Sequence, residues 1–198
     1  DDEHTILLLR GEGNLYNQSA LSEDAVATVG TVSFVDNGID DLGKAIYVNN
    51  SSGTSYLTVP HSEYLSLNND WTIELWFKAT SYNDGFQYLM FKPFSDQDYL
   101  ANYAIQLNGN WENRLWGYYN YSNTSYKGVN NDFVPELNVW YHVTFIRDVN
   151  NDEIRLIVRD ENRNIIQEMS TKNISGYNPL INRMVYLLDL TSRGILLK

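Results

Sequence analysis

Aromatic and charged side chains alternate with apolar ones in residues 69–81, NDWTIELWFKATS. If this segment is extended, one face carries four apolar side chains, Trp71, Ile73, Leu75 and Phe77. The other face then carries Thr72, Glu74, Trp76 and Lys78. A tryptophan beside a carboxylate can serve core packing, stack on a sugar ring, or form half of a catalytic site.

The same alternation in three further segments, 102–108, 114–120 and 140–148, adds polar and aromatic groups to the faces opposite their apolar rows. Trp111 lies in the turn between the first two of these segments. We assign the candidate binding residues to one solvent-facing wall, and they are Glu74, Gln106, Trp111, Arg114, Trp116, Tyr118 and His142. Nearby loops are expected to add Tyr82, Phe86, Tyr121 and Tyr126.

This combination of side chains suits carbohydrate. A sugar ring has an apolar C–H face that stacks on an aromatic ring. Its hydroxyl groups need amide, carboxylate or guanidinium partners in a fixed geometry. The sequence therefore predicts a glycan-binding face, and the alternative is that the same tryptophans only pack against covering loops.

The elements that must position these residues are β-strands. Helical patterns are scarce, and about eleven short alternating segments are separated by turns rich in Asn, Asp, Gly and Ser. Residues 5–10 are expected to form the first strand, and residues 27–35 another. KAIYVN and SYLTVP, at 44–49 and 55–60, flank a polar loop and predict a hairpin-like pair. The pattern favours a single antiparallel all-β domain over residues 1–198, a sandwich or a barrel.

Composition excludes several classes of protein. The chain has 198 residues and a formal net charge of -11, which argues against nucleic acid and anionic membrane as partners. It contains no cysteine, so disulfides, zinc fingers and cysteine nucleophiles are excluded. We find no apolar run of 18 residues, so no membrane insertion is expected.

Three stretches resemble the laminin G-like, or concanavalin A-like, jelly-roll superfamily. They are GKAIYVNNSSGTSYLTVPHSEYLSLNNDWTIELWFKAT at 43–80, YLMFKPFSDQDYLANYAIQLNGN at 88–110 and LNVWYHVTFIRDVNNDEIRLIVRDENRNII at 137–166. The resemblance implies a two-sheet antiparallel jelly-roll β-sandwich. It also implies a non-catalytic carbohydrate-binding or adhesion module of an exported, extracellular or cell-surface protein, accompanied by other modules of the same polypeptide. The tip RDENRN and the closing segment MVYLLDLTSRGILLK depart from the family pattern.

Two other functions stay open. Some jelly-roll relatives cleave polysaccharides, but the paired carboxylates of a glycoside hydrolase are absent, since Glu74 stands alone on its strand. A polysaccharide lyase would need a tyrosine and a histidine near arginine and glutamine, and the available set is His142, Tyr118, Arg114 and Gln106. Alternatively, the sandwich is a scaffold that binds or assembles with proteins.

Calcium is the one cofactor that the sequence suggests. Many jelly-roll modules hold Ca²⁺ at an edge of the sandwich, and Ca²⁺ takes oxygen ligands. The densest group of such ligands is the turn VDNGIDD, with Asp36, Asn37, Asp40 and Asp41. An ordinary acidic turn is the alternative.

Overall fold

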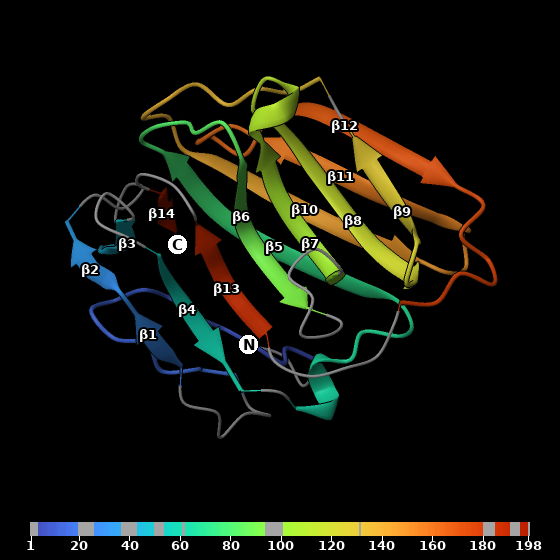
Figure 1. Ribbon diagram of the computed structural model, residues 1–198, viewed down its shortest axis with the longest axis horizontal. Helices are drawn as coiled ribbons and strands as arrows, with labels where there is room; N and C mark the ends of the chain where they lie inside the picture. Colours follow the sequence, from blue (N-terminus) through green and yellow to red (C-terminus); the bar gives the residue numbers. More distant parts are fainter. Residues whose placement is uncertain are drawn as a thin grey trace.

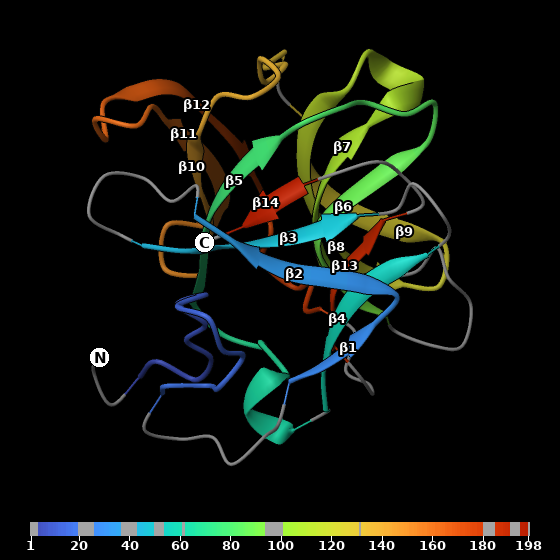
Figure 2. The ribbon, with the colours of Figure 1, turned by 90° about the vertical axis from the view of Figure 1, so that its left-hand side faces the viewer.

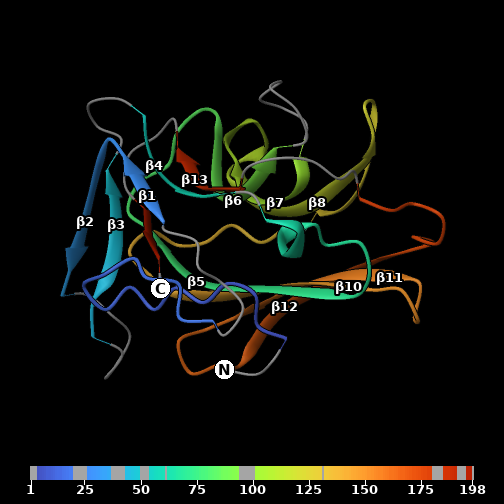
Figure 3. The ribbon, with the colours of Figure 1, turned by 90° about the horizontal axis from the view of Figure 1, so that it is seen from below.

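The computed structural model describes residues 4–19, 26–36, 43–49, 54–60, 62–93, 101–130 and 132–179, together with the backbone of 185–190 and 195–197. Within these ranges the chain forms two antiparallel sheets packed face to face, which confirms the predicted two-sheet sandwich. Figure 3 shows the layers edge-on, with β6, β7, β8 and β13 above and β5, β10, β11 and β12 below. No helix in the described ranges is long and apolar enough to cross a membrane.

The first sheet, called the β8 sheet, has seven strands (Figure 1). In spatial order they are β1 (Ala27–Val29), β4 (Ser55–Val59), β13 (Val185–Leu190), β6 (Phe86–Pro93), β7 (Ala101–Asn108), β8 (Arg114–Ser122) and β9 (Ser125–Asn130). A short 3₁₀ helix, η3 (Gly109–Trp111), joins β7 to β8. This sheet carries Gln106, Arg114, Trp116 and Tyr118 among the candidate binding residues.

The second sheet, called the β5 sheet, also has seven strands. In spatial order they are β12 (Ile165–Lys172), β11 (Glu153–Arg159), β10 (Tyr141–Asp148), β5 (Trp71–Ala79), β14 (Ile195–Leu197), β3 (Ala45–Asn49) and β2 (Thr31–Val35). Figure 2 shows β2 and β3 side by side at one edge of this sheet. A second 3₁₀ helix, η2 (Glu63–Leu65), lies in the connection between β4 and β5.

The alternation of apolar residues fills the space between the sheets. From the β5 sheet, Ile73, Phe77, Val143 and Phe145 are buried in the main core. From the β8 sheet, the core receives Tyr103, Ile105, Leu107, Leu115 and Tyr119. The inward set predicted for these strands is therefore confirmed. The sheets approach so closely at Gly117 that a Cβ there would lie 3.1 Å from the ring of Phe145.

Two predictions about the first third of the chain were wrong. Residues 5–10 form no strand. Strands β3 and β4 do not pair with each other, because β3 lies in the β5 sheet and β4 in the β8 sheet. A polar loop between two alternating segments fits a crossing between sheets as well as a hairpin, so the sequence did not distinguish them.

The predicted strand 27–35 is also divided between the sheets. Gly30 separates β1 in the β8 sheet from β2 in the β5 sheet, with a φ of 71°. A Cβ at Gly30 would lie 2.5 Å from the carbonyl oxygen of Thr54 and 2.4 Å from Oγ of Ser55. Only glycine combines this backbone angle with such a close approach, so Gly30 allows the chain to pass from one sheet to the other.

A lysine lies inside the sandwich. Lys92, on β6, has no exposed surface, and its Nζ donates a hydrogen bond of 2.7 Å to the carbonyl oxygen of Leu65. The hydroxyl of Tyr103 donates to the same oxygen at 3.1 Å, and the ammonium lies 5.9 Å from the centre of the Tyr103 ring. Burial lowers the pKa of Lys92 to about 8.

This burial predicts a stability that rises with pH. The unfolded chain keeps the Lys92 proton up to a pKa of about 10.4, whereas the folded chain releases it near pH 8. Between these values, raising the pH favours the folded state. We expect the wild-type protein to gain about 2 kcal/mol in unfolding free energy between pH 8 and pH 10 relative to Lys92→Met. Urea denaturation of both proteins across this range measures the difference, with Lys44→Met, at a half-exposed lysine, as the control. Parallel pH profiles for wild type and Lys92→Met would show that the lysine is not buried as described.

Candidate functional site

The candidate binding residues lie on two outer faces of the sandwich, not on one wall. Glu74 and His142 belong to the β5 sheet, whereas Gln106, Trp116 and Tyr118 belong to the β8 sheet. The prediction of a single shared wall was therefore wrong. Outward-facing residues alternate in the same way in both sheets, so alternation alone could not tell which sheet a strand joins.

The outer face of the β8 sheet carries a continuous group of aromatic rings, called here the aromatic platform. Its members are Phe86, Tyr88 and Phe91 from β6, Trp111 from η3, Trp116 and Tyr118 from β8, and Tyr126 from β9. Trp116 contacts three other rings, and its ring centroid lies 5.4 Å from that of Trp111, 4.6 Å from that of Tyr118 and 5.2 Å from that of Tyr126. Figure 1 shows β6, β8 and β9, which carry most of these rings, in one sheet with β7 between β6 and β8.

The rings differ in their access to solvent. Trp111 and Tyr126 are 44% and 49% exposed, and Phe86 is 38% exposed. Tyr88 and Trp116 are half-buried. Tyr118 is buried, and it packs with Phe91 in a cluster separate from the main core. The exposed rings can contact a ligand, and the buried ones hold them in place.

Strand register aligns the platform across the sheet. Tyr88, Gln106 and Trp116 are direct neighbours on β6, β7 and β8. Gln106 is 1% exposed, and its Oε1 has no hydrogen-bond partner in the part of the chain that the structure describes. The amide predicted to contact a ligand therefore lies beneath the rings.

Gly128 makes room for the central tryptophan. It is opposite Tyr118 on the neighbouring strand β9. A Cβ at Gly128 would lie 2.7 Å from Nε1 of Trp116 and 3.1 Å from Cβ of Tyr118. The indole of Trp116 can lie against the sheet only because this position has no side chain.

The turn that presents Trp111 is fixed by its own backbone. Oδ1 of Asn108 accepts a hydrogen bond of 3.1 Å from the backbone N–H of Asn110, at the start of η3. Glu112 and Asn113 then adopt left-handed conformations, with φ of 56° and 61°. These two residues end the 3₁₀ helix and return the chain into β8.

Arg114 begins β8 next to the aromatic rings, and it is held by two carboxylates. Its guanidinium donates to Oδ1 of Asp132 at 2.6 Å and to Oε2 of Glu112 at 3.1 Å. Both acidic side chains are largely exposed. The guanidinium predicted to contact a ligand is therefore part of a three-residue charged group at one end of the platform.

The four residues considered for a lyase do not come together. His142 lies on the β5 sheet, and the other three lie on the β8 sheet. Burial, reinforced by Tyr88, raises the pKa of Tyr118 well above its usual value, so its hydroxyl stays protonated. Burial lowers the pKa of His142, against the opposing effect of Glu74.

The outer face of the β5 sheet has a different character. The rings of Trp76 and His142 lie 4.9 Å apart, and Oγ1 of Thr144 donates to Oε1 of Glu74 at 3.2 Å. NH1 of Arg159 in turn donates to Oγ1 of Thr144 at 2.8 Å. These polar groups satisfy one another.

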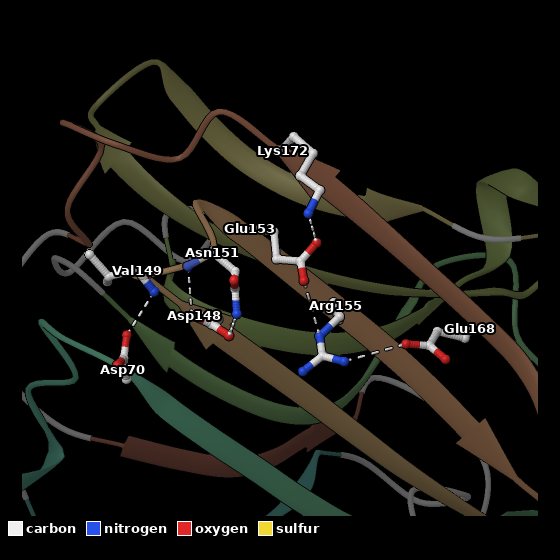
Figure 4. A network of polar contacts seen from close by, with 8 residues as sticks. All are labelled: Asp70, Asp148, Val149, Asn151, Glu153, Arg155, Glu168 and Lys172. Atoms are coloured by element: carbon white, nitrogen blue, oxygen red, sulfur yellow. Dashed lines mark hydrogen bonds and ion pairs between the residues drawn. The ribbon is translucent and has the colours of Figure 1, made fainter.

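Ion pairs cover the part of this face formed by β11 and β12 (Figure 4). Glu153 pairs with Lys172 and with Arg155, and Arg155 also reaches Glu168 at 3.6 Å. In the turn between β10 and β11, the backbone N–H of Val149 donates a hydrogen bond of 2.7 Å to Asp70, which directly precedes β5. A charged, self-paired surface of this kind offers fewer places for a sugar ring to stack.

The predicted calcium ligands can be followed only in part. Asp36 lies directly after β2 and pairs with Nζ of Lys44 at 3.7 Å. Asn37, Asp40 and Asp41 lie outside the described residues. Among the described residues, no group of three or more His, Cys, Asp or Glu could hold a metal ion. Calcium at this turn stays a prediction.

Sequence reasoning missed Tyr88 and Gly128. Tyr88 is two residues after Phe86 in FQYLMF, so the alternation used for the other strands would have placed both on one face. No comparable signal marks Gly128, because its role depends on which strand lies beside β8. Phe86, Tyr121 and Tyr126, expected in loops, lie on strands β6, β8 and β9.

Comparison with known proteins shows which family and which solved structures this chain resembles. A family model described as the concanavalin A-like lectin/glucanases superfamily matches residues 51–181. No curated protein matches the sequence. The receptor binding domain of botulinum neurotoxin mosaic serotype C/D aligns with a TM-score of 0.65 and 12% identity, over 96% of this chain and 47% of that chain. This chain thus spans about half the length of that toxin domain.

Two further solved structures are similar. Winged bean acidic lectin, complexed with methyl-α-D-galactose, aligns with a TM-score of 0.52 and 11% identity, over 89% of this chain and 93% of the lectin. The enzymatically active domain of bacteriophage CBA120 tailspike protein 2 aligns with a TM-score of 0.57 and 10% identity, over 89% of this chain and 29% of the tailspike chain. At these identities the likeness shows a shared fold.

The close approach at Gly128 predicts the effect of a single methyl group. Gly128→Ala should displace the indole of Trp116 and lower the unfolding free energy by about 1–3 kcal/mol, because the neighbouring atoms leave no room. Near-ultraviolet circular dichroism should change with it, since the coupled rings of Trp116, Tyr118 and Tyr126 would lose their arrangement. Gly85→Ala is the control, because a Cβ there meets only the Asn83 side chain at 3.8 Å. If the Gly128→Ala spectrum and stability match those of the control, Trp116 does not lie against this glycine.

Proposed function

This chain belongs to the concanavalin A-like lectin/glucanases superfamily, and we propose that it binds carbohydrate through the aromatic platform of the β8 sheet. The observation that carries the proposal is the arrangement of Trp111, Trp116 and Tyr126. Two well-exposed rings flank a half-buried one, and the centroids of successive rings are 5.4 Å and 5.2 Å apart. Such a surface offers apolar faces to the C–H faces of sugar rings.

Polar groups border the platform where sugar hydroxyls would need partners. Asn130 is exposed and lies opposite Trp116 on the neighbouring strand. Glu112, Arg114 and Asp132 lie at the end that Trp111 occupies. Carboxylates accept hydrogen bonds from hydroxyl groups, and the guanidinium donates them, so together these groups can orient a stacked ring.

The similar structures support the proposal at the level of the fold. Winged bean acidic lectin was solved with methyl-α-D-galactose, and the toxin domain is a receptor binding domain. A sugar complex is thus known for at least one protein of similar architecture, the winged bean lectin. The evidence for glycan binding that comes from this chain's own residues is the aromatic platform.

We further propose that the chain is an adhesion or binding module of an exported protein with other modules. The partial coverage of the toxin domain and the tailspike is consistent with a module within longer polypeptides. The calcium ion predicted at residues 36–41 remains part of this proposal. Glycan binding measured with and without a chelator would test its contribution.

Catalysis and protein assembly are the competing functions. The tailspike domain is described as enzymatically active, so the fold is compatible with catalysis. Of the residues that we considered for a lyase, however, His142 lies on the opposite sheet from the other three, and no observation in the described residues favours a catalytic set over the platform. Release of reducing ends or unsaturated products from a polysaccharide panel would identify an enzyme.

Removal of an exposed ring tests the platform directly. After a glycan array identifies a ligand, Trp111→Ala and Tyr126→Ala should each weaken its binding by about 1–3 kcal/mol, because each variant removes a stacking surface. Isothermal titration calorimetry measures the change. Both residues are on the surface, so the unfolding free energy should stay within about 0.5 kcal/mol of the wild-type value.

Tyr64→Ala is the matched control for these variants. Tyr64 is 61% exposed on η2, an element that contributes no ring to the platform, and its removal should leave binding unchanged. Wild-type affinity in both platform variants would reject the platform as the binding site. If the wild-type protein bound a protein ligand but no glycan, the assembly function would be favoured instead.

A further inference from the structure

We infer that the aromatic platform selects uncharged saccharides over acidic ones, an inference that rests on the proposed glycan-binding function. It depends on the charges that border the platform. An acidic glycan needs cationic groups that are free to pair with carboxylates or sulfates. The β8 sheet offers no such group in the part of the chain that the structure describes.

Only three residues are charged in β1, β4, β6, β7, β8 and β9, and all three are basic, Lys92, Arg114 and Lys127. Lys92 faces the core and is fully buried. Lys127 is opposite Tyr119, a core residue, so it also points to the inner side of the sheet, where its Nζ lies 4.2 Å from the ring of Tyr177. Arg114 is therefore the one cationic side chain of these strands that faces the platform side.

Arg114 is already neutralised. Its guanidinium pairs with Asp132 at 2.6 Å and with Glu112 at 3.1 Å, so this group of three residues has a net charge of -1. A carboxylate or sulfate that approached Arg114 would have to displace one carboxylate and would be repelled by the other. The net charge of -11 for the whole chain adds to this repulsion at low salt.

An uncharged sugar meets a favourable surface instead. Its hydroxyls can donate to the carboxylates of Glu112 and Asp132 and to the exposed amide of Asn130. The platform extends across the sheet from β6 to β9, a width of three strand spacings of about 4.8 Å each. It is therefore wide enough for more than one sugar ring. The preferred ligand is therefore an uncharged oligosaccharide or polysaccharide lying across the strands.

Matched pairs of glycans test this inference. The full chain is titrated with dextran and dextran sulfate, with cellulose oligosaccharides and carboxymethylcellulose, and with further neutral and acidic pairs that share a backbone. We expect at least one neutral member to bind, with an affinity that changes less than about twofold between about 50 mM and about 500 mM NaCl. Its acidic counterpart should bind at least about tenfold more weakly, because of the carboxylates around Arg114.

A variant that removes the two carboxylates shows whether acidic glycans are excluded by charge repulsion or by a poor steric fit. Glu112→Gln combined with Asp132→Asn releases Arg114, so the preference for the neutral member should fall several-fold, chiefly through stronger binding of the acidic member. The inference would be overturned if the wild-type protein bound the acidic member as tightly as the neutral one or more tightly, and if salt and Arg114→Gln weakened that binding. The proposed glycan-binding function would then still stand. An unchanged preference in the double variant would also overturn the inference. Failure of every pair to bind would overturn the proposed function, and the inference with it.

Discussion

The packed layer between the two sheets is the constraint on which every outward-facing group depends. Each strand places alternate side chains in that layer, and those of Phe77, Ile105, Tyr119 and Phe145 have no exposed surface. A shift of one residue in β8 would turn Trp116 into the core and Leu115 out to solvent. At Gly117 the layer leaves only 3.1 Å between a hypothetical Cβ and Phe145, so the register of this strand is fixed by packing from the opposite sheet.

The sequence predicted which side chains face inward, but not which sheet carries them. Strands β5 and β8 have the same kind of alternation, and both outer faces hold a tryptophan beside polar groups. Sheet membership is decided by pairing between distant strands, such as β5 with β10 and β7 with β8. Nothing local in either segment encodes those partners. For this reason the fold class was predicted correctly, whereas the single binding wall divided into two faces.

The platform owes its shape to residues with no direct part in binding. Gly128 gives Trp116 the space to lie against the sheet, and the buried Tyr118 supports it from the side. The left-handed turn after η3 presents Trp111 at the surface. These supports come from three different elements, so they could be recognised only once the strands were assembled. The outer face of the β5 sheet is covered in part by ion pairs, whereas that of the β8 sheet carries aromatic rings. This difference favours the β8 sheet as the binding surface.

The five tryptophans offer the most direct measurement, because each indole N–H gives its own nuclear magnetic resonance signal. Trp111 and Trp116 belong to the platform, Trp71 is in the core, and Trp76 and Trp140 pack in a separate cluster with residues of the β5 sheet. On titration of nitrogen-15-labelled protein with a bound glycan, the signals of Trp111 and Trp116 should shift while the other three stay in place. A shift of the Trp76 signal, with those of Trp111 and Trp116 unchanged, would place the sugar on the opposite face and contradict the proposed site.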